Sequence, residues 1–374
     1  MLLTTFPEVN ANMTAIYTLD LSHNNINSIT EKVCEECLSL RMLVLSYNKM
    51  DRFSISDSNE LVWPSALQYL DLSHNQFTDT SQIPILKNLV DLKILKLNNN
   101  KLTNFVLDTK VMLAKLQELH LHGNPITYFF IDSLALKTLT LSFTPFNYKF
   151  AKLSVIDAEN LQYVYFKNTS DILHIEWEPS SALRFLQYVN ASLDDRDLAN
   201  INLYPNSETL KALSLKNNNL YLDFYFNQFS KRVKGITHLD LSFNKIWAIR
   251  ASTFAELKNL KDLLLNDNQI RILDWRILKE LKKLEYLDIR NNYITSSQHF
   301  LESLTQPFHM HSILLANNPF NCTCDNDISK AITRQMSGEF HVLDPLEIRH
   351  SIRCGTPSEY NGQLVANVNI SSCS

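Results

Sequence analysis

The sequence is poor in glycine: it has only 5 Gly among 374 residues. No two of them are closer than seven positions; they are Gly123, Gly235, Gly338, Gly355 and Gly362. A dinucleotide-binding G-x-G-x-x-G, a phosphate-binding G-x-x-x-x-G-K and a G-x-S-x-G nucleophile elbow are therefore absent. Most of the common routes to nucleotide chemistry are excluded.

Long apolar runs and a strong net charge are also missing. Nowhere do eighteen apolar residues follow one another, so no segment is predicted to span a bilayer. Residues 1–9 lack the basic start and the apolar stretch of a signal peptide. Lys and Arg number 35 against 39 Asp and Glu, a net charge of −4 that does not favour a polyanion at neutral pH. With 45% hydrophobic residues, the chain has enough apolar surface for a core.

The chain does have an internal repeat of about 24 residues. The segment ITHLDLSFNKI from Ile236 follows the pattern L-x-x-L-x-L-x-x-N-x-L, and the segments from Leu260 and Leu284 repeat it. The same frame gives thirteen units, which start at Ile16, Leu40, Leu67, Leu92, Leu116, Leu136, Leu161, Leu183, Leu210, Ile236, Leu260, Leu284 and Met310. This is the leucine-rich repeat pattern.

The pattern predicts an α/β solenoid, a leucine-rich-repeat horseshoe with a concave parallel β-sheet. The x-L-x-L core is expected to be a short strand with inward leucines, and the Asn to bond backbone groups of the next coil. Because no unit buries its own apolar face, the ends need caps. We therefore expect a lead-in at 1–15 without an N-terminal cap, about thirteen repeats at 16–317, and a cysteine-rich C-terminal cap at 318–374.

The predicted cap carries four cysteines, Cys322, Cys324, Cys354 and Cys373, in a C-x-C followed by two distant positions. Two disulfides are expected, and four cysteines allow three connectivities. Structural disulfides imply an oxidising compartment. No such cluster precedes the first repeat, which, with the missing signal peptide, suggests a truncated chain.

The 24-residue repeats and a cap that begins NPFNCTCD resemble the ectodomains of Toll-like receptors. The match is closest over 235–374, where LNDNQIRILDWRILKELKKLEYLDIRNN resembles the endosomal, nucleic-acid-sensing branch. The resemblance implies pairing of Cys322 with Cys354 and of Cys324 with Cys373. It also implies an innate immune pattern-recognition receptor in the extracellular space or endosomal lumen, in which ligand-induced homo- or heterodimerisation brings cytoplasmic TIR domains together beyond a membrane span.

The repeats over 136–209 are irregular. Three of them lack the Asn anchor and carry Thr144, Thr169 and Ala191 instead, with uneven spacings. We expect this stretch to change local curvature or to open the core, and plain drift is the alternative. Its outward strand positions are rich in aromatic residues and form the predicted ligand site, with Tyr163, Tyr165 and Lys167 on one strand and Phe185, Gln187 and Val189 on the next. Such a surface suits an apolar or aromatic ligand or a protein partner, whereas these rings would be core if the repeat is degenerate.

Histidines offer a second hypothesis. Glu118, His120 and His122 share one exposed strand face, and His238 is similarly placed with Asp240, whereas His23 and His74 are expected to be simply solvated. Protonation of all 11 His would raise the net charge to at most +7, so that nucleic acid could bind at acidic pH. His120 and His122 therefore join the predicted ligand-binding residues.

Catalysis, metal binding and cofactors are not expected. Cys34 and Cys37 form a C-x-x-C without a second pair, which favours a local disulfide or two free thiols over zinc. Glycosylation sequons occur at Asn12, Asn168, Asn190, Asn321 and Asn369. The alternative to a receptor is a secreted or surface leucine-rich-repeat protein that acts in adhesion or as a soluble decoy.

Overall fold

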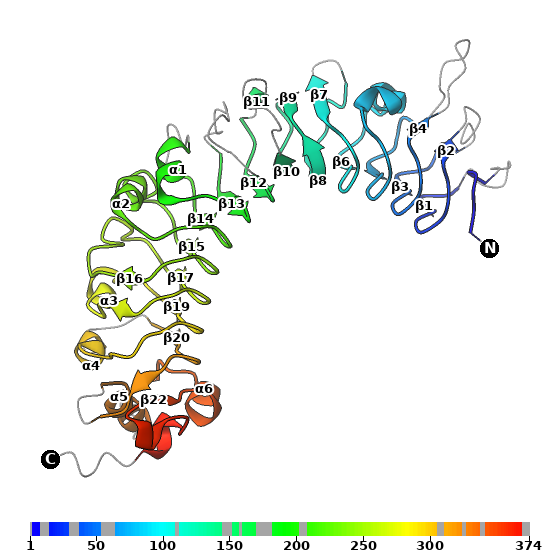
Figure 1. The fold of residues 1–374 in the computed structure, drawn as a ribbon. Helices are drawn as coiled ribbons and strands as arrows, with labels where there is room; N and C mark the ends of the chain where they lie inside the picture. The colour runs from blue at the N-terminus through cyan, green and yellow to red at the C-terminus, as the bar shows by residue number, and fades with distance from the viewer. Residues whose placement is uncertain are drawn as a thin grey trace. The chain divides into compact units, whose positions relative to one another are not determined.

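The computed structural model describes residues 2–7, 15–29, 37–53, 64–108, 112–143, 152–156, 159–169, 182–201, 208–304, 310–323, 327–336 and 341–368. The chain divides into two compact units, and each is a parallel β-solenoid (Figure 1). Unit 1 takes in Met1–Ala191 and Asn202–Pro205, and unit 2 takes in Ser192–Ile201 and Asn206–Ser374.

In unit 1, one short parallel strand of each repeat joins a continuous sheet. The strands follow one another in chain order as β1 (Thr18–Asp20), β3 (Met42–Val44), β5 (Tyr69–Asp71), β6 (Ile94–Lys96), β8 (Glu118–Ile126), β10 (Thr138–Phe143), β12 (Tyr163–Lys167) and β13 (Phe185–Val189). Each begins two residues after the first position of a repeat, and the register aligns equivalent leucines, as in Leu43 with Leu70. Leu43, Leu70 and Leu95 are at most 1% exposed because they point into the solenoid.

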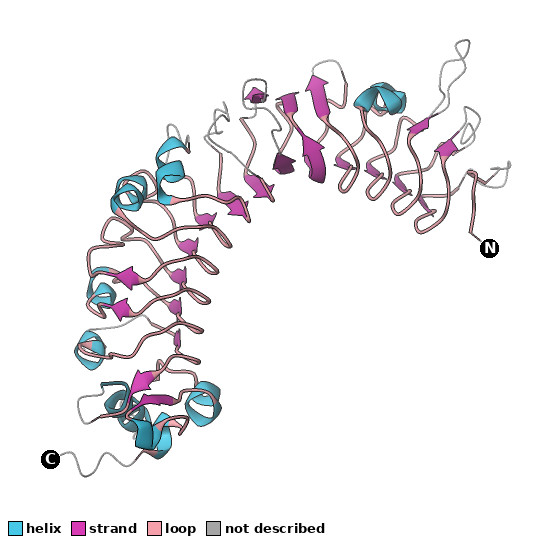
Figure 2. Cartoon of the chain, in the orientation of Figure 1, coloured by secondary structure: helices cyan, strands magenta, loops and turns pink. Residues whose placement is uncertain are grey.

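The return paths of unit 1 also contain short strands and 3₁₀ helices, on the side away from this sheet (Figure 2). They contain the parallel pair β2 (Ser28–Ile29) and β4 (Arg52–Phe53), and the parallel strands β7 (Asn104–Asp108), β9 (Tyr128–Asp132) and β11 (Lys152–Ile156). Two 3₁₀ helices, η2 (Thr80–Gln82) and η3 (Pro84–Asn88), lie between β5 and β6. Phe105 and Phe129 stack across neighbouring return paths with ring centroids 5.7 Å apart, which gives this side a core of its own.

Unit 2 repeats the plan with helices on its return paths. Its sheet strands are β14 (Ala212–Ser214), β15 (His238–Asp240), β17 (Asp262–Leu264), β19 (Tyr286–Asp288) and β20 (Ser312–Leu314), and β16 (Ala248–Ile249) pairs with β18 (Ile272–Leu273). The helices are α1 (Asp195–Asn200), α2 (Phe224–Ser230), α3 (Ile277–Glu280) and α4 (Phe300–Ser303). Phe254 and Leu257, on the return path between β16 and β17, are fully buried.

The C-terminal segment of unit 2 closes the sheet. It contains β21 (Phe320–Asn321), α5 (Asp327–Met336), α6 (Pro345–His350), β22 (Cys354–Thr356), η5 (Ser358–Tyr360) and η6 (Val365–Asn367). Cys322 and Cys354 form a disulfide, the pairing that the resemblance implies, while Cys324 and Cys373 lie outside the described residues. On α6, the Glu347 carboxylate accepts bonds from the N–H groups of Leu315 (2.6 Å) and Ala316 (3.1 Å), directly after the last strand.

The anchor asparagines join neighbouring repeats. Asn268 Oδ1 accepts from the Ile246 N–H at 3.1 Å, and its Nδ2 donates to the carbonyls of Leu241 and Leu265, both at 3.0 Å. In the same way, a backbone N–H of the preceding repeat donates to the Oδ1 atom of eight other anchors: Asn48, Asn75, Asn100, Asn124, Asn218, Asn244, Asn292 and Asn318. The expectation of bonds to the next coil was therefore wrong, because the side chain reaches the chain that leaves the previous turn.

The residue just before each anchor has a left-handed backbone. Examples are His23 (φ 55°), Asn99 (φ 53°) and Phe243 (φ 57°). This conformation favours Gly and Asn and strains bulky residues. Gly123 (φ +77°) holds the position in β8, where an added Cβ would lie 2.1 Å from Asn99 Oδ1, so a larger residue there would require the Asn99 amide to move.

The irregular repeats keep a closed core at the anchor positions that the structure describes. Thr169 is fully buried and Ala191 is 2% exposed, so the expected opening is not found at these two residues; Thr144 lies outside the described part. Instead, the strands are longer: β12 and β13 have 5 residues each, against 3 in β3. The predicted leucine-rich-repeat solenoid with a parallel sheet and a disulfide-bonded C-terminal end is confirmed.

Candidate ligand-binding surface

The longest sheet strands of unit 1 lie side by side. β8 has 9 residues and β10 has 6, and β12 and β13 follow them in the sheet. The ladder between β8 and β10 shifts register between Leu141 and Phe143, a local irregularity where the repeat is shortest. Longer strands present more outward side chains per repeat, so this is the widest part of the face.

Aromatic residues occupy both faces of β12 and β13. Phe166 and Tyr188 point inward and stack with ring centroids 4.9 Å apart, and both are fully or almost fully buried. Tyr165 and Phe185 point outward, with ring centroids 5.0 Å apart at a tilt of 39°. The alternative that the outward rings have become core is therefore wrong for Tyr165 and Phe185, because strand alternation keeps them on a partly exposed face.

The predicted site residues share this outward face. Tyr163 pairs in register with Phe185, and Tyr165 pairs with Gln187. Tyr163 is 39% exposed, whereas Tyr165, Lys167, Phe185 and Gln187 are partly exposed. The structure therefore brings the five residues from the irregular repeats together.

His120 and His122 reach the same face through Thr140. The register places Thr140 opposite both His120 and Tyr165, which makes it the link between the two parts of the surface. Thr140 Oγ1 lies 3.3 Å from His120 Nδ1 and 3.2 Å from His122 Nδ1. His120 Nε2 lies 3.3 Å from a carboxylate oxygen of Glu118. Sequence reasoning missed Thr140, although its place in the repeat frame would have identified it.

Burial controls the charge of both histidines. It lowers the pKa of His122 to about 4, and the nearby charges of Lys167, His120 and His74 act in the same direction. Burial also lowers the pKa of His120, against an opposing effect of Glu118. The His122 imidazole is therefore neutral at an endosomal pH near about 5.5, and the proposed acid-dependent charge does not arise from it.

Three cations lie on or beside the strands of this part of the sheet. Lys167 ends β12, and Arg184, just before β13, is exposed. Lys96 lies one strand from His120 in register, with its Nζ 5.1 Å from the centre of the Tyr69 ring. Burial alone would lower the Lys96 pKa, but the Tyr69 hydroxyl and nearby carboxylates raise it. Lys96 thus keeps its charge, and an anionic ligand with a flat apolar part would find complementary groups here.

The other singled-out histidines lie elsewhere. His238 Nε2 is 2.7 Å from Asp262, its partner in register on β17, rather than bonded to Asp240. His23 and His74, expected to be simply solvated, stack on the two faces of Tyr47 at centroid distances of 4.3 and 3.9 Å. This stack occupies the left-handed position before three successive anchors and was missed. The repeated LSHN and LSYN letters could have revealed it.

Two predicted sequon asparagines lie at the edge of the surface. Asn168 and Asn190 directly follow β12 and β13, both are exposed, and Asn190 Nδ2 donates to Asn168 Oδ1 at 2.8 Å. Asn321 lies on β21 beside a polar hollow, and Asn12 and Asn369 lie outside the described residues. Glycosylation at all five stays a prediction.

The remaining sequence expectations concern metals and thiols. No group of three or more metal-ligating side chains occurs among the described residues. Cys37 takes part in a disulfide, which agrees with the disulfide alternative for the C-x-x-C. No helix in the described part of the chain is long and apolar enough to cross a membrane.

Comparison with known families supports the repeat assignment. The "Leucine rich repeat" family model matches residues 14–77, 65–126 and 234–294. These are the regular repeats on both sides of the irregular stretch. The family match agrees with the parallel solenoid of the structure. The chain is a leucine-rich-repeat protein. Its family and fold are of a non-enzymatic receptor or scaffold type.

Among its relatives are Toll-like receptors and other leucine-rich-repeat proteins. The chain is 25% identical to Toll-like receptor 8 of Homo sapiens over 246 residues, 45% of this chain and 23% of that receptor. It is 26% identical to Podocan of Mus musculus over 346 residues, 89% of this chain and 53% of Podocan. It therefore spans about half or less of the length of either relative. The solved Leptospira interrogans LRR protein LIC12759 shares the fold, with a TM-score of 0.57 and 23% identity over 83% of this chain and 75% of that one.

Proposed function

We propose that this leucine-rich-repeat protein is the ligand-binding ectodomain of a Toll-like pattern-recognition receptor in innate immunity. It works outside the cytosol, in the extracellular space or the endosomal lumen. Ligand capture leads two ectodomains to pair, and a membrane span and a TIR domain outside this sequence carry the signal. The relation to Toll-like receptor 8 and the disulfide between Cys322 and Cys354 support this proposal.

The observation that carries it is the outward aromatic pair Tyr165 and Phe185 on the widest part of the unit 1 sheet. Rings left on the surface of a rigid sheet, away from the buried Phe166 and Tyr188, serve recognition rather than core packing. Two cations, Lys167 and Arg184, lie close in sequence to the pair, at the end of β12 and just before β13. The ligand class that this surface suits is an anion with a flat ring system, which includes nucleic acid.

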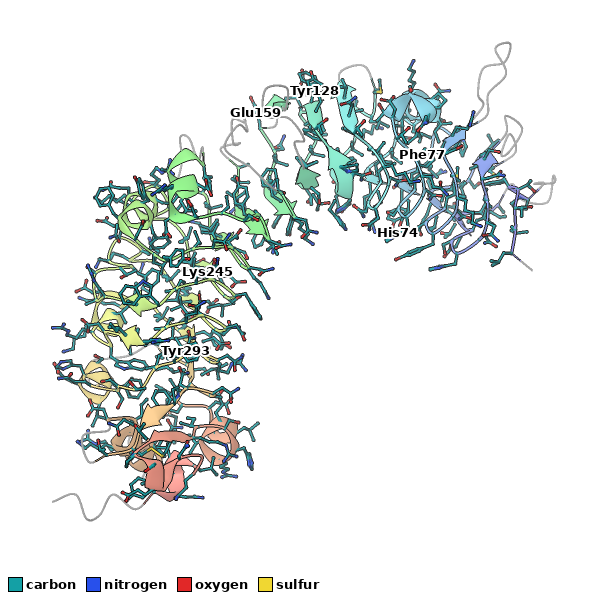
Figure 3. All side chains as sticks on the ribbon, viewed as in Figure 1. His74, Phe77, Tyr128, Glu159, Lys245 and Tyr293 are labelled. Atoms are coloured by element: carbon teal, nitrogen blue, oxygen red, sulfur yellow. A yellow bond between two sulfur atoms is a disulfide. The ribbon has the colours of Figure 1, made fainter. Side chains whose placement is uncertain are left out.

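Pairing of ectodomains requires a second surface. In unit 2, one large apolar side chain stays exposed after the anchor asparagine of each of four successive repeats: Tyr221 (46%), Trp247 (51%), Ile272 (56%) and Tyr293 (54%). Tyr293 is labelled in Figure 3, and the Arg271 guanidinium lies 5.8 Å from the centre of its ring. Exposed aromatic and apolar side chains with one cation are a composition that protein interfaces favour, so we propose these residues, called here the flank of unit 2, as the pairing surface.

Binding tests the ligand surface. A fluorescein-labelled single-stranded RNA oligonucleotide, titrated with the purified chain at pH 7.4 and 5.5, reports affinity by fluorescence anisotropy. Tyr165→Ala with Phe185→Ala should weaken binding by about tenfold or more, since stacking on an aromatic ring contributes about 1–3 kcal/mol per base. The matched control is Tyr128→Ala, a ring of similar exposure (37%) on β9, away from the surface (Figure 3). Equal affinity of all three proteins would contradict the proposed site.

Sedimentation velocity tests the pairing surface. If the flank pairs ectodomains, a ligand that binds should raise the dimer fraction of the parent protein, and Trp247→Ala should reduce it. Val90→Ala is the control, an exposed apolar residue (55%) in unit 1. A monomer at every ligand concentration would remove the pairing part of the proposal while leaving ligand binding.

The second candidate is a secreted or surface leucine-rich-repeat protein that acts in adhesion or as a decoy. The similarity to Podocan, which extends over 89% of this chain, favours it. Sequencing the transcript beyond the codon for Ser374 separates the two. A membrane span followed by a TIR domain supports the receptor, and a stop codon supports the second candidate.

A further inference from the structure

A polar hollow of about 750 Å³ lies at the junction between the last repeats and the C-terminal segment of unit 2. Its lining residues are Thr295, Ser296, Ser297, Gln298, Asn321, Thr323, Asp327, Lys330 and Thr356. The size is that of a small-molecule site, yet such sites are mostly apolar. A lining of hydroxyls, amides and one charge of each sign instead suits a sugar, whose surface is dense in hydroxyl groups.

The hollow contains a glycosylation sequon. Asn321, Cys322 and Thr323 read N-x-T, and the side chains of Asn321 and Thr323 both line the space. The disulfide from Cys322 to Cys354 and the bond from the Asn321 N–H to the Thr295 carbonyl (2.8 Å) fix this backbone.

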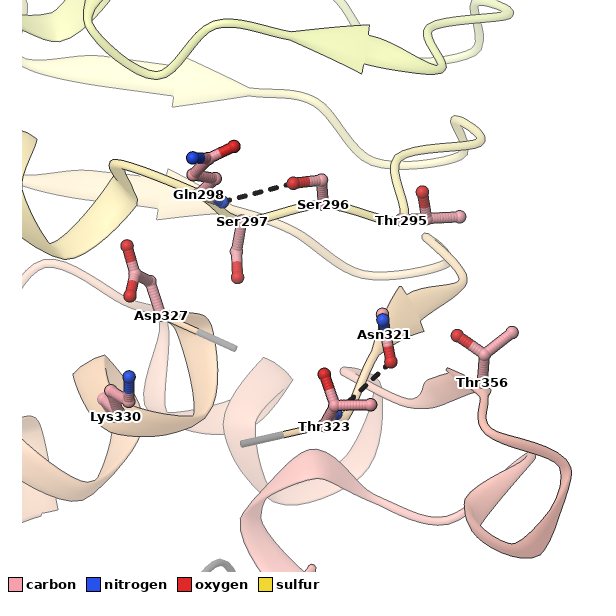
Figure 4. A pocket seen from close by; sticks show the side chains of 9 residues that line it. All are labelled: Thr295, Ser296, Ser297, Gln298, Asn321, Thr323, Asp327, Lys330 and Thr356. Carbon is pink, nitrogen blue, oxygen red and sulfur yellow. Dashed lines mark hydrogen bonds between the residues drawn. The ribbon is translucent and has the colours of Figure 1, made fainter. Parts of the chain in front are cut away.

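The orientation of the Asn321 amide aims its nitrogen at the hollow. Its Oδ1 accepts from the Thr323 N–H at 3.3 Å, so Oδ1 faces the chain that follows. In Figure 4 the nitrogen lies on the opposite side, toward the segment from Thr295 to Gln298. A group attached to this nitrogen would start inside the hollow rather than in open solvent.

We propose that Asn321 carries an N-linked glycan whose first N-acetylglucosamine is seated in this hollow. Transfer forms a bond between Asn321 Nδ2 and C1 of the sugar, while the bond from C1 to a lipid diphosphate donor breaks. The diphosphate leaves with the bonding electrons, and the amide nitrogen loses one proton. The seated sugar then hydrogen-bonds Gln298 and the hydroxyls of Thr295 and Thr356. This proposal does not depend on the ligand or the pairing partner.

The sequon at Asn190, whose asparagine and serine both lie in the described part of the chain, serves as the comparison site. Asn190 is exposed at the end of β13 and lies outside the residues that line the hollow. A glycan there would extend into solvent. The two sites should therefore differ in how accessible the sugar–asparagine bond is in the folded protein.

Native-state deglycosylation measures this difference. The chain is expressed in glycosylating eukaryotic cells, and peptide N-glycosidase, which cleaves the sugar–asparagine bond, is applied with site-resolved mass spectrometry. The hydrogen bonds that seat the sugar must break before cleavage, and each contributes about 1 kcal/mol, so cleavage at Asn321 should be more than about tenfold slower than at Asn190. After denaturation the two rates should be equal.

Variants distinguish a sugar that is held in the hollow from a glycan that is only attached to Asn321. Thr323→Ala removes the sequon and Thr323→Ser keeps it, so only the first should abolish the glycan and reduce hydrogen-exchange protection at 295–298. Gln298→Trp, made at an exposed lining position, should fill the hollow and raise the native cleavage rate at Asn321 to that at Asn190. An unmodified Asn321, or equal native rates at the two sites in the parent protein, would overturn the proposal.

Discussion

The amide oxygen of Asn268 lies 3.1 Å from the backbone nitrogen of Ile246, 22 residues earlier in the chain. Together with the two carbonyls that Asn268 Nδ2 contacts, this bond makes one side chain the joint between two repeats.

Replacement of this joint should be expensive for stability. Asn268→Ala leaves the buried Ile246 N–H without its acceptor, at a cost of about 1–3 kcal/mol. The Leu241 and Leu265 carbonyls each lose one bond but keep a second, from Asn244 and Asn292. We expect the free energy of unfolding to fall by about 2–4 kcal/mol, measured by urea denaturation. The control Asn361→Ala removes an exposed amide and should change it by less than about 0.5 kcal/mol. Equal effects would show that the anchors are not structural joints.

The inward and outward aromatic pairs on β12 and β13 should differ in how much they contribute to the free energy of unfolding. Phe166→Ala empties a fully buried site and should cost about 3–5 kcal/mol of stability. Tyr165→Ala, on the next residue but the other face, should cost no more than about 1.5 kcal/mol. Urea denaturation of both variants checks this, and a large loss in Tyr165→Ala would mean that the outward ring is structural.

His122 should make the protein less stable in acid. Its folded pKa of about 4 lies below the ordinary value for histidine, so the unfolded chain binds the proton more readily. The contribution is fully present above about 6.5 and is lost as the pH falls from there toward about 4. His122→Gln should therefore flatten the dependence of the melting temperature on pH in this window. A titration of the His122 ring by NMR with a midpoint near about 6.5 would contradict the assignment.

Glu347 should stabilise the end of the sheet through its acceptor oxygens. Glu347→Ala leaves the N–H groups of Leu315 and Ala316 without this partner, and hydrogen exchange at these two amides should accelerate more than tenfold, for a loss of about 1.5–3 kcal/mol. Because burial raises the Glu347 pKa, the neutral Glu347→Gln should be tolerated better. Glu359→Ala, on the exposed surface of η5, should leave both amides unchanged.

The regular part of the fold could be predicted from the sequence because the same pattern of leucines and asparagine recurs in each repeat. A leucine at a fixed offset from an asparagine has one consistent placement, so strand starts and the inward face follow from spacing alone. The pairing of Cys322 with Cys354 followed from resemblance rather than from spacing.

The candidate surface was only partly readable. Alternation along a strand identified Tyr165 and Phe185 as outward. Thr140 holds the same place in its repeat as His120 and Tyr165, so the same reasoning could have found it, but it was missed. The histidine charges were out of reach for a different reason. Composition counts titratable groups, whereas the lowered pKa of His122 depends on how much water its ring loses.

The carboxylate of Glu347 also bears on whether another copy of the chain can add a strand to the edge of the sheet at β20. The open end of a parallel ladder is a template on which another chain can grow, and this is how fibres begin. Beyond β20, the Ile313 N–H donates to the Val342 carbonyl (2.8 Å), and the Glu347 carboxylate accepts from the two N–H groups that follow the strand, so these donors are already occupied. The C-terminal segment therefore keeps copies of this chain from polymerising end to end at this edge, and contacts between copies there are left to side chains.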